Sequence, residues 1–323
     1  MKIIRVLISI LISVLCLYFA TRNVEWAELK VILSRAQVAP ILAAVLVSLF
    51  SFLTRTARWG IILQPFQKIS FVSLLRWQIG GLLINNLLPL RMGEFARAYW
   101  AGHKSSISKS SVLATILLER ILDVGTIGCI AIFILTLLGK GGPLLTPGTL
   151  FVFGLTLLLL YFVLKTYFNR LGQIPFKEKL EKVLPEKIKH FLRKFLSGLQ
   201  VIKDKREIAK LLAISLITWC IDITSIYIMA GSLSIHLSWF GAGFTIVGLV
   251  LGVMIPAAPG AAGTYEAGGV IALTLLGTDK TLALSFILLL HAVQYLFVLI
   301  IGIPILIAEG FSPKKLLQNN NNQ

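Results

Sequence analysis

Long apolar segments recur along almost the whole chain, and they constrain the fold more than any other feature of the sequence. A helix that crosses a bilayer needs roughly 17–25 mainly apolar residues. Segments that approach this length cover about residues 3–20, 38–54, 70–88, 111–138, 149–168, 211–231, 238–256, 262–276 and 281–308. The pattern predicts an all-α polytopic membrane protein.

Composition leaves no room for a separate soluble domain. The chain is 57% hydrophobic and 14% charged, whereas soluble domains average roughly 45–50% and about 25%. We therefore expect one integral membrane domain over 1–310, followed by a disordered polar tail at 311–323. The net charge of +17 is spread between apolar segments, which favours anionic membrane lipids as partners over nucleic acid.

The distribution of Lys and Arg predicts the orientation in the membrane. If both termini are cytoplasmic, 25 basic residues fall on that side and 5 on the other, as the positive-inside rule requires. This predicts a multi-pass protein of the cell (cytoplasmic) membrane. Segment 165–210 holds 13 basic and 5 acidic residues, so 170–208 is expected to form an amphipathic helix on the cytoplasmic leaflet. Positive-inside topology alone would explain the same charges.

The same orientation gives the two halves of the chain, about 1–140 and 145–310, opposite topology. Each half then contains one interrupted element, at 70–100 and at 238–276. The prediction is about eight transmembrane segments, including two broken or re-entrant helices, arranged as an inverted repeat. Transporters use such repeats to bring interrupted helices together at a substrate site.

Each interrupted element contains proline, glycine and an acid in the same order. The first has Pro89, Gly93 and Glu94, and the second has Pro259, Gly263 and Glu266. Proline removes a backbone donor and glycine accepts unusual backbone angles, so both strings should interrupt a helix. The freed backbone groups must be buried in protein or line a wet cavity. Ordinary turns at the bilayer surface are the alternative.

Several ionisable residues fall inside apolar segments. Glu119 and Asp123 are four residues apart on one helix face, with Arg120 beside them. They could line a polar site, since charges at such depth usually face the bundle interior, or Arg120 and Asp123 could form a simple clamp. Asp222 could be a proton-relay residue, a counter-ion, or a partner of a neighbouring Ser or Thr. Arg55, Arg58 and Trp59 end the second span; we interpret the pairing of Arg and Trp there as an interfacial anchor, with a specific lipid-binding role as the alternative.

Signatures of enzymes and metal sites are missing from the sequence. It contains no H-E-x-x-H, P-loop or G-x-S-x-G string. Cys16, Cys129 and Cys220 are far apart within apolar segments, so neither a disulfide framework nor a C-x-x-C site is available. No cofactor, metal or enzymatic activity is expected.

Four strings together resemble a known family. They are Arg58-Trp59, the N-x-L-P-x-R-x-G-E-x-x-R pattern from Asn86 to Arg97, E-R-x-x-D from Glu119 to Asp123, and P-x-x-P-G-x-x-G-x-x-E from Pro256 to Glu266. This set resembles the integral-membrane part of the lysyl-phosphatidylglycerol synthase/flippase family, which includes stand-alone flippase-like proteins. The resemblance implies movement of a polar-headed lipid between leaflets. Aminoacyl transfer in that family belongs to a separate soluble domain, which we do not expect here.

The working hypothesis is a polar cavity through which a phospholipid or polyprenyl-linked head group crosses. Arginines would bind the phosphate, helix N-termini after Pro89 and Pro259 would add positive charge, and the acids would orient the arginines or carry a proton. The candidate site residues are Asn86, Pro89, Arg91, Gly93, Glu94, Arg97, Glu119, Arg120, Asp123, Pro256, Pro259, Gly260, Gly263 and Glu266. The alternatives are a membrane-embedded lipid-modifying enzyme and an accessory subunit of a transferase encoded elsewhere.

Overall fold

The computed structural model describes residues 2–88, 91–137, 205–255 and 257–309, and within these ranges it contains helices and no strand. The long helices are α1 (Lys2–Thr21), α3 (Val38–Leu63), α6 (Lys109–Leu137), α11 (Lys205–Ala230) and α14 (Lys280–Ala308). The shorter ones are α2 (Trp26–Ser34), α4 (Phe71–Leu87), α5 (Met92–Lys104), α12 (Trp239–Met254) and α13 (Thr264–Leu275), with 3-10 turns η1 (Gly231–Leu233) and η2 (Pro259–Ala261). The all-α prediction is confirmed. The expected segments 149–168 and 170–208 and the tail 311–323 lie outside the described residues.

Three described helices, α3, α11 and α14, are each long and apolar enough to cross a membrane. The α1–α2 pair adds a fourth span if the two helices, bent by 84°, are counted together. Helix α6 is 29 residues long and carries its charged residues in its first half. The protein is therefore a polytopic membrane protein, as the apolar segments predict.

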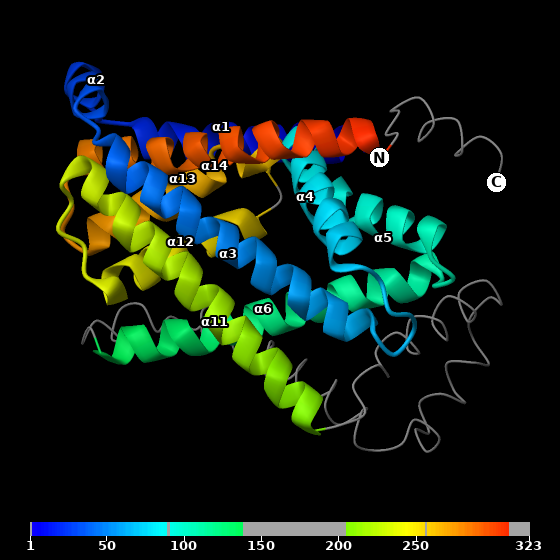
Figure 1. The fold of residues 1–323 in the computed structure, drawn as a ribbon. Helices are drawn as coiled ribbons and strands as arrows, with labels where there is room; N and C mark the ends of the chain where they lie inside the picture. Colours follow the sequence, from blue (N-terminus) through cyan, green and yellow to red (C-terminus); the bar gives the residue numbers. More distant parts are fainter. Residues whose placement is uncertain (1, 89–90, 138–204, 256, 310–323) are drawn as a thin grey trace, which may run out of the picture.

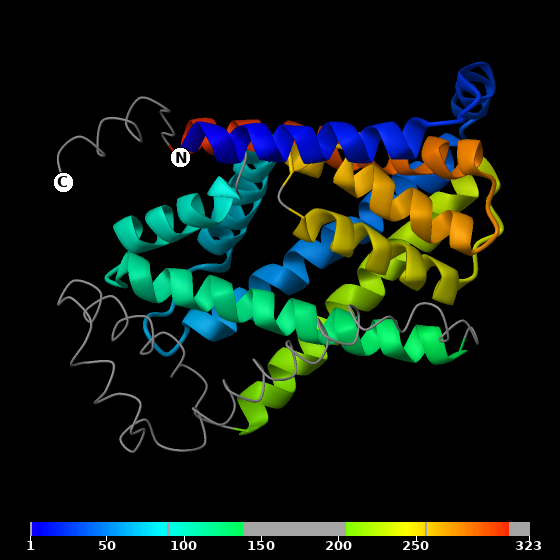
Figure 2. The ribbon, with the colours of Figure 1, turned by 180° about the vertical axis from the view of Figure 1, so that it is seen from behind.

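The two interrupted elements expected from the sequence form helical hairpins in the structure. Helices α4 and α5 have 17 and 13 residues, and α12 and α13 have 16 and 12, so each is shorter than the ~20 residues of a spanning helix. Ser70 and Ser238 cap the first helix of each hairpin by accepting a backbone N–H. The hairpins enter from opposite ends of the molecule and point toward each other (Figures 1 and 2).

The packing of the helices repeats in the two halves. Helices α3 and α11 lie side by side and run in opposite directions (Figure 1). Each packs on the first helix of its own hairpin, α4 or α12, and the second hairpin helix, α5 or α13, packs on α6 or α14. In turn α14 contacts α4 and α6 contacts α12. This arrangement agrees with the predicted inverted repeat and places both hairpin tips at the centre.

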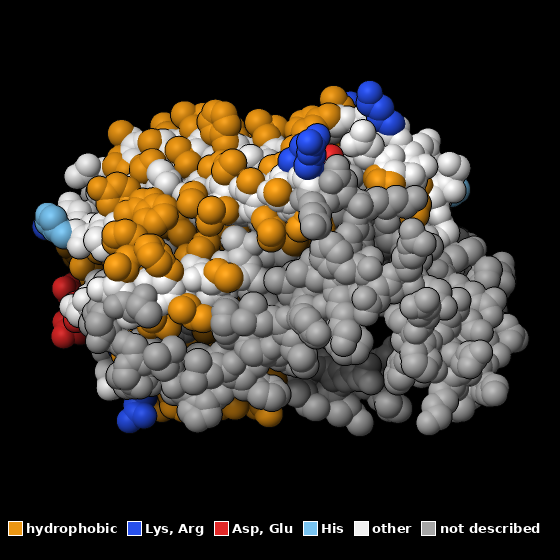
Figure 3. Space-filling view, turned by 90° about the horizontal axis from the view of Figure 1, so that it is seen from below, with side chains coloured by type: hydrophobic (Ala, Val, Ile, Leu, Met, Phe, Trp, Pro, Cys, Tyr) orange, Lys and Arg blue, Asp and Glu red, His pale blue; other side chains and the backbone are white. Residues whose placement is uncertain are grey.

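The outer surface is apolar. Large hydrophobic side chains such as Phe50, Leu46, Ile300 and Ile307 are exposed on α3 and α14, and hydrophobic side chains cover much of the described surface in Figure 3. Several polar and charged side chains are buried instead, among them Arg58 and Glu119. Apolar outside and charged inside is the distribution expected in lipid.

Candidate functional site

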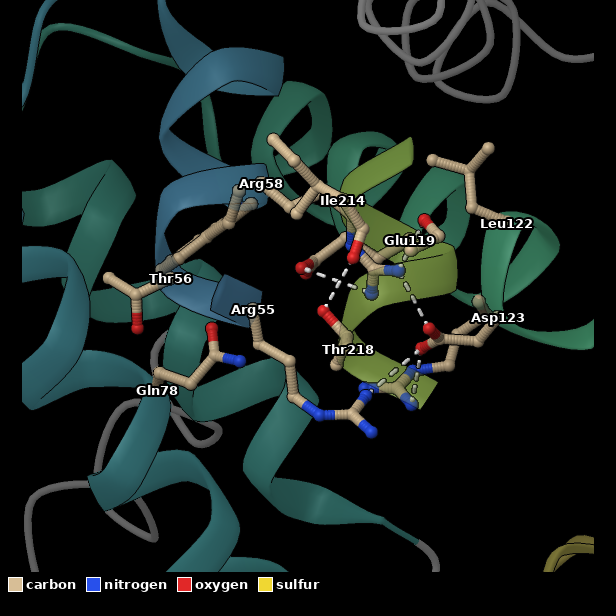
Figure 4. A network of polar contacts seen from close by, with 12 residues as sticks. Arg55, Thr56, Arg58, Gln78, Glu119, Leu122, Asp123, Ile214 and Thr218 are labelled. Carbon is tan, nitrogen blue, oxygen red and sulfur yellow. Dashed lines mark hydrogen bonds and ion pairs between the residues drawn. The ribbon is translucent and has the colours of Figure 1, made fainter. Parts of the chain in front are cut away.

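A network of ion pairs fills the space between α3, α5, α6 and α11. Arg58 of α3 lies 2.8 Å from Asp123 and 3.9 Å from Glu119. Arg97 of α5 donates to the second carboxylate oxygen of Glu119 at 2.7 Å. The two acids thus share Arg58 from one side of α6, as their spacing predicts, and Figure 4 shows Arg58, Glu119 and Asp123 converging.

Arg58 and Arg97 are enclosed within the protein. The Arg58 side chain is 1% exposed and also donates to Ser215 of α11. Arg97 donates to Gln78 and lies over the ring of Trp59, 4.1 Å from its centroid. Trp59 itself is fully buried, so the interpretation of Arg58 and Trp59 as an interfacial anchor is wrong. Both side chains point into the bundle because carboxylates on α6 offer Arg58 a partner there.

A second, less enclosed part of the network reaches α11 and the first hairpin. Arg55 lies 2.6 Å from Asp222 and 3.7 Å from Asp123, so Asp222 serves as a counter-ion for Arg55. Arg120 lies 3.1 Å from Glu94 and 3.5 Å from Asp123. The Arg120–Asp123 clamp therefore exists and is at the same time part of the larger polar site.

The tips of the two hairpins touch each other. Arg91, which precedes α5 and has left-handed backbone angles (φ 54°), donates to the carbonyl of Val253 at the end of α12, at 2.9 Å. Tyr295 of α14 donates to the backbone carbonyl of Asn86. Left-handed backbone angles such as those of Arg91 are strained in a non-glycine residue, and such strain is concentrated at functional sites. The Arg91 contact links the two halves of the repeat directly.

The first hairpin depends on a close helix crossing. Asn85 accepts the backbone N–H of Gly93 at 2.7 Å, which closes the break before α5. A Cβ atom at Gly93 would lie only 1.7 Å from the carbonyl oxygen of Gly81, so α4 and α5 meet backbone to backbone there. Asn86, which the sequence pattern suggested, contributes its carbonyl, whereas the side chain at the break is that of Asn85. Pro89 lies outside the described residues.

The second break is organised around Glu266. Its carboxylate accepts the N–H of Gly263 at 2.6 Å and lies 2.5 Å from Nδ1 of His291. Gly260 and Gly263 have φ values of 67° and 90°, which favour glycine. Of the two roles left open for Glu266, orienting an arginine or carrying a proton, the first has no partner among the described ion pairs: Glu266 contacts a histidine, because α13 turns its acid toward α14 and away from α6. Pro259 begins η2, and Pro256 lies outside the described residues.

Two neighbouring cavities of about 390 and 320 Å³ lie where the hairpins meet. Seven residues line both of them: Ser48, Arg55, Arg120, Asp222, Ser225, Val253 and Gln294. Arg97 and Glu94 line the larger cavity, and Arg91 and Asp123 line the smaller one. Apolar side chains such as Phe52 complete the walls. The candidate residues from the first hairpin and α6 are thus brought together, whereas Glu266 lies beside this site.

Some residues of this site carried little signal in the sequence. Gln78, Asn85, His291 and Gln294 were not singled out, because a lone polar residue in an apolar segment does not reveal its partner. Asp222 was singled out without its partner Arg55. Polar residues inside the apolar segments of both halves, considered together, would have indicated these positions. Among the described residues, no three His, Cys, Asp or Glu side chains are grouped as ligands for a metal ion.

The fold and the site define a class of protein: a polytopic α-helical membrane protein with two re-entrant hairpins around internal polar cavities. The model of the family described as the lysylphosphatidylglycerol synthase TM region matches residues 6–302. The chain belongs to this family, and the resemblance seen in its motifs is confirmed.

Curated relatives are similar over most of their length. A UPF0104 membrane protein of Methanocaldococcus jannaschii is 24% identical over 85% of this chain and 85% of its own. One from Pyrococcus horikoshii is 24% identical over 84% of this chain and 87% of its own. A third, from Methanothermobacter thermautotrophicus, is 23% identical over 97% and 98%. All three are membrane proteins by name.

Proposed function

We propose that this protein moves an anionic phospholipid between the leaflets of the membrane through its central cavities. The observation that carries this proposal is the mixed lining of the larger cavity. Arg55, Arg97 and Arg120 lie on its wall together with Phe52 and Phe297. A wall with both charged and apolar parts suits an amphiphile, and a cavity of about 390 Å³ is within the range of small-ligand sites.

The arginines of the site divide into two groups by their partners. Arg58 and Arg97 are buried and each lies against a carboxylate, so their charges are balanced within the protein. Arg91 has no carboxylate within ion-pair distance among the described residues, and its one described side-chain bond goes to a backbone carbonyl. A guanidinium has five donors. Arg91 therefore has donors available for a phosphate in the smaller cavity, and the 38% exposed side chain of Arg120 lies on the wall of the same cavity.

The contact between Arg91 and Val253 suggests how a head group would act. A phosphate is a stronger acceptor for arginine than a neutral carbonyl because both partners are then charged. A head group that takes Arg91 away from Val253 would separate the hairpin tips. Lipid binding would thereby favour an arrangement in which the cavities open toward the other leaflet.

The test is movement of a fluorescent phosphatidylglycerol across proteoliposomes, followed by a quencher that reaches only the outer leaflet. Arg91→Gln should slow this movement by about 10-fold or more, since a lost charged hydrogen bond costs about 1.5–3 kcal/mol. Lys210→Gln is the matched control, because Lys210 forms only an exposed pair with Glu207 among the described contacts.

Three outcomes would contradict the proposal. Wild-type protein that leaves the labelled lipid in place would remove the transport function and favour the role of an accessory subunit. A lipid of altered mass after incubation would favour an enzyme. Unchanged movement with Arg91→Gln would exclude Arg91 from head-group binding.

A further inference from the structure

A second polar cluster, which we call the α13–α14 cluster, lies next to the central cavities. It consists of Tyr265, Glu266, His291, Gln294 and Tyr295. The ring of Tyr265 packs against that of His291, with centroids 4.3 Å apart and ring planes tilted by 31°, and its hydroxyl donates to Gln294 at 3.0 Å. None of these contacts belongs to the arginine network. The cluster therefore needs its own explanation.

The core of the cluster is a buried acid–imidazole pair that can exist in two charge states. The side chains of Glu266 and His291 are 6% and 15% exposed, and their nearest polar atoms are 2.5 Å apart. With a neutral imidazole the pair has a net charge of −1, and with an imidazolium its net charge is zero. An uncompensated buried charge is costly. One proton thus decides whether the break before α13 contains an unbalanced charge.

The pair is mechanically connected to both hairpin tips. Glu266 holds the N–H of Gly263 at the start of α13. One turn along α14 from His291, Tyr295 donates to the carbonyl of Asn86 in the last turn of α4. His291 also makes a ring contact with Tyr295. A change in the charge or position of the His291 ring would therefore alter contacts at the break of the second hairpin and at the end of the first.

Residues of the α13–α14 cluster also line the central cavities. Tyr265 lines the smaller cavity, and its partner Gln294 lines both. The other elements packed around the pair contribute few ionisable groups. Asp222 of α11 faces Tyr265 but lies against Arg55, and α1 presents Ser13, which accepts the N–H of Ala258. Among the described residues, no Lys or Arg forms an ion pair with Glu266.

We propose that the Glu266–His291 pair is a proton-binding site whose occupancy is coupled to lipid movement. The ligand is a proton taken up by the imidazole of His291 and released on the opposite side of the membrane. The neutral pair holds the two hairpin tips together, and loss of the proton weakens the contacts at Gly263 and Asn86. This inference rests on the proposed lipid transport and names its energy source.

The experiment uses the full chain in vesicles of phosphatidylethanolamine and phosphatidylglycerol, with a pH-sensitive dye inside. The movement of fluorescent phosphatidylglycerol is measured with and without a gradient of one pH unit. In the wild type, the rate with the gradient should be up to about tenfold higher than the rate without it, because such a gradient is worth 1.36 kcal/mol per proton. The ratio of the two rates should fall to one in His291→Gln and Glu266→Gln. His236→Gln, which changes a histidine in the loop between η1 and α12, is the matched control.

A second measurement does not depend on transport. Nuclear magnetic resonance of histidine-labelled protein in lipid nanodiscs, with His291→Gln for assignment, reports the protonation of His291. We expect the protonation state of the His291 ring to differ between the wild type and Glu266→Gln, because the Glu266 carboxylate lies 2.5 Å from its Nδ1. The same protonation state in both proteins would overturn the proposal.

The outcomes separate the two proposals. Lipid movement in the wild type with a ratio of one, or an unchanged ratio in His291→Gln, overturns proton coupling and leaves the transport function intact. A wild type that moves no lipid under either condition overturns the transport function, and coupling with it. A gradient-dependent rate that disappears only in the Glu266 and His291 variants supports both.

Discussion

Burial decides what each arginine of the central site can do. Arg58 and Arg97 are buried and held by carboxylates, although Arg97 also lies on the wall of the larger cavity; Arg91 and Arg120 are more exposed and line the smaller one. We therefore expect a structural role for the buried arginines and propose head-group binding for the more exposed ones. Arginine suits both roles because its charge persists when it is buried and its donors form a planar fork.

Replacement of Arg58 should destabilise the protein more than that of any exposed basic residue. Arg58→Met removes the nearest partner of Asp123 and a partner of Glu119, and breaking a buried ion pair costs up to about 3–5 kcal/mol. The remaining contacts of Asp123, to Arg55 and Arg120, are longer. Thermal unfolding in detergent, followed by the loss of monodisperse protein, measures the change. Lys210→Met provides the comparison at an exposed position.

A second variant distinguishes charge from packing. Adding Asp123→Asn to Arg58→Met removes the charge that has lost its nearest partner and should recover part of the lost stability. If Arg58→Met unfolds at the wild-type temperature, the buried network does not stabilise the fold as described here.

At the scale of elements, the hairpins are held by backbone contacts at glycine. In the first, Gly93 meets Gly81, and in the second, Gly268 meets Gly248, where an added Cβ would lie 1.7 and 2.2 Å from a carbonyl oxygen. Lipid tails are as apolar as leucine, so helices in a membrane associate through close packing of small residues. These glycines therefore allow the two short helices of each hairpin to pack with their backbones in contact.

Gly93→Ala should disrupt the first hairpin. The added methyl group cannot fit against Gly81 without moving α4 and α5 apart, and forced overpacking costs about 1–3 kcal/mol or more. We expect a lower unfolding temperature and slower lipid movement. Gly231→Ala is the control, since its added Cβ would come no closer than 4.0 Å to Pro40. Wild-type behaviour of Gly93→Ala would show that the crossing tolerates separation.

The contact between α3 and α14 provides a second prediction for elements. Phe52 and Phe297 line the larger cavity, and their ring centroids are 5.7 Å apart. A lipid whose tails remain in the bilayer must pass between spanning helices, and this aromatic pair could separate to admit it. In a variant without its natural cysteines, Phe52→Cys and Phe297→Cys joined by a short thiol-reactive linker should stop lipid movement. The same protein before linking is the control, and movement that continues after linking would exclude this route.

The whole molecule combines an inverted arrangement of helices with an asymmetric distribution of charge. The two hairpins enter from opposite ends (Figure 2), and two cavities lie where their tips meet. The positive-inside rule predicts that the basic loops lie on the cytoplasmic side. Both the predicted orientation and the proposed transport depend on the complete chain.

Labelling from one side of the membrane tests the orientation. In a variant without its natural cysteines, Gln67→Cys, between α3 and α4, should react with a membrane-impermeant maleimide only after cells are opened. His236→Cys, before α12, should react in intact cells. The reverse result would place both termini outside and contradict the orientation predicted from Lys and Arg.

Sequence patterns were sufficient for the helices and the breaks. Helix α1 matches the apolar segment 3–20, and α14 matches 281–308 closely. Helices form where apolar runs are long, because in lipid each helix satisfies its own backbone hydrogen bonds. Proline and glycine interrupt this pattern locally. The two hairpins, the inverted order of elements and the family motifs were accessible for the same reason.

Partners of the charged residues were decided only by tertiary structure. Arg55 and Asp222 are 167 positions apart, and no local pattern indicates that they touch. Arg58 was expected at the membrane interface and is buried. Glu266 was expected to orient an arginine or carry a proton, and it lies against His291. In a membrane, backbone hydrogen bonds form within each helix, so a short stretch of sequence is enough to predict them. A buried charge must instead find its counter-charge on another helix, so only the packing of the whole chain determines that choice.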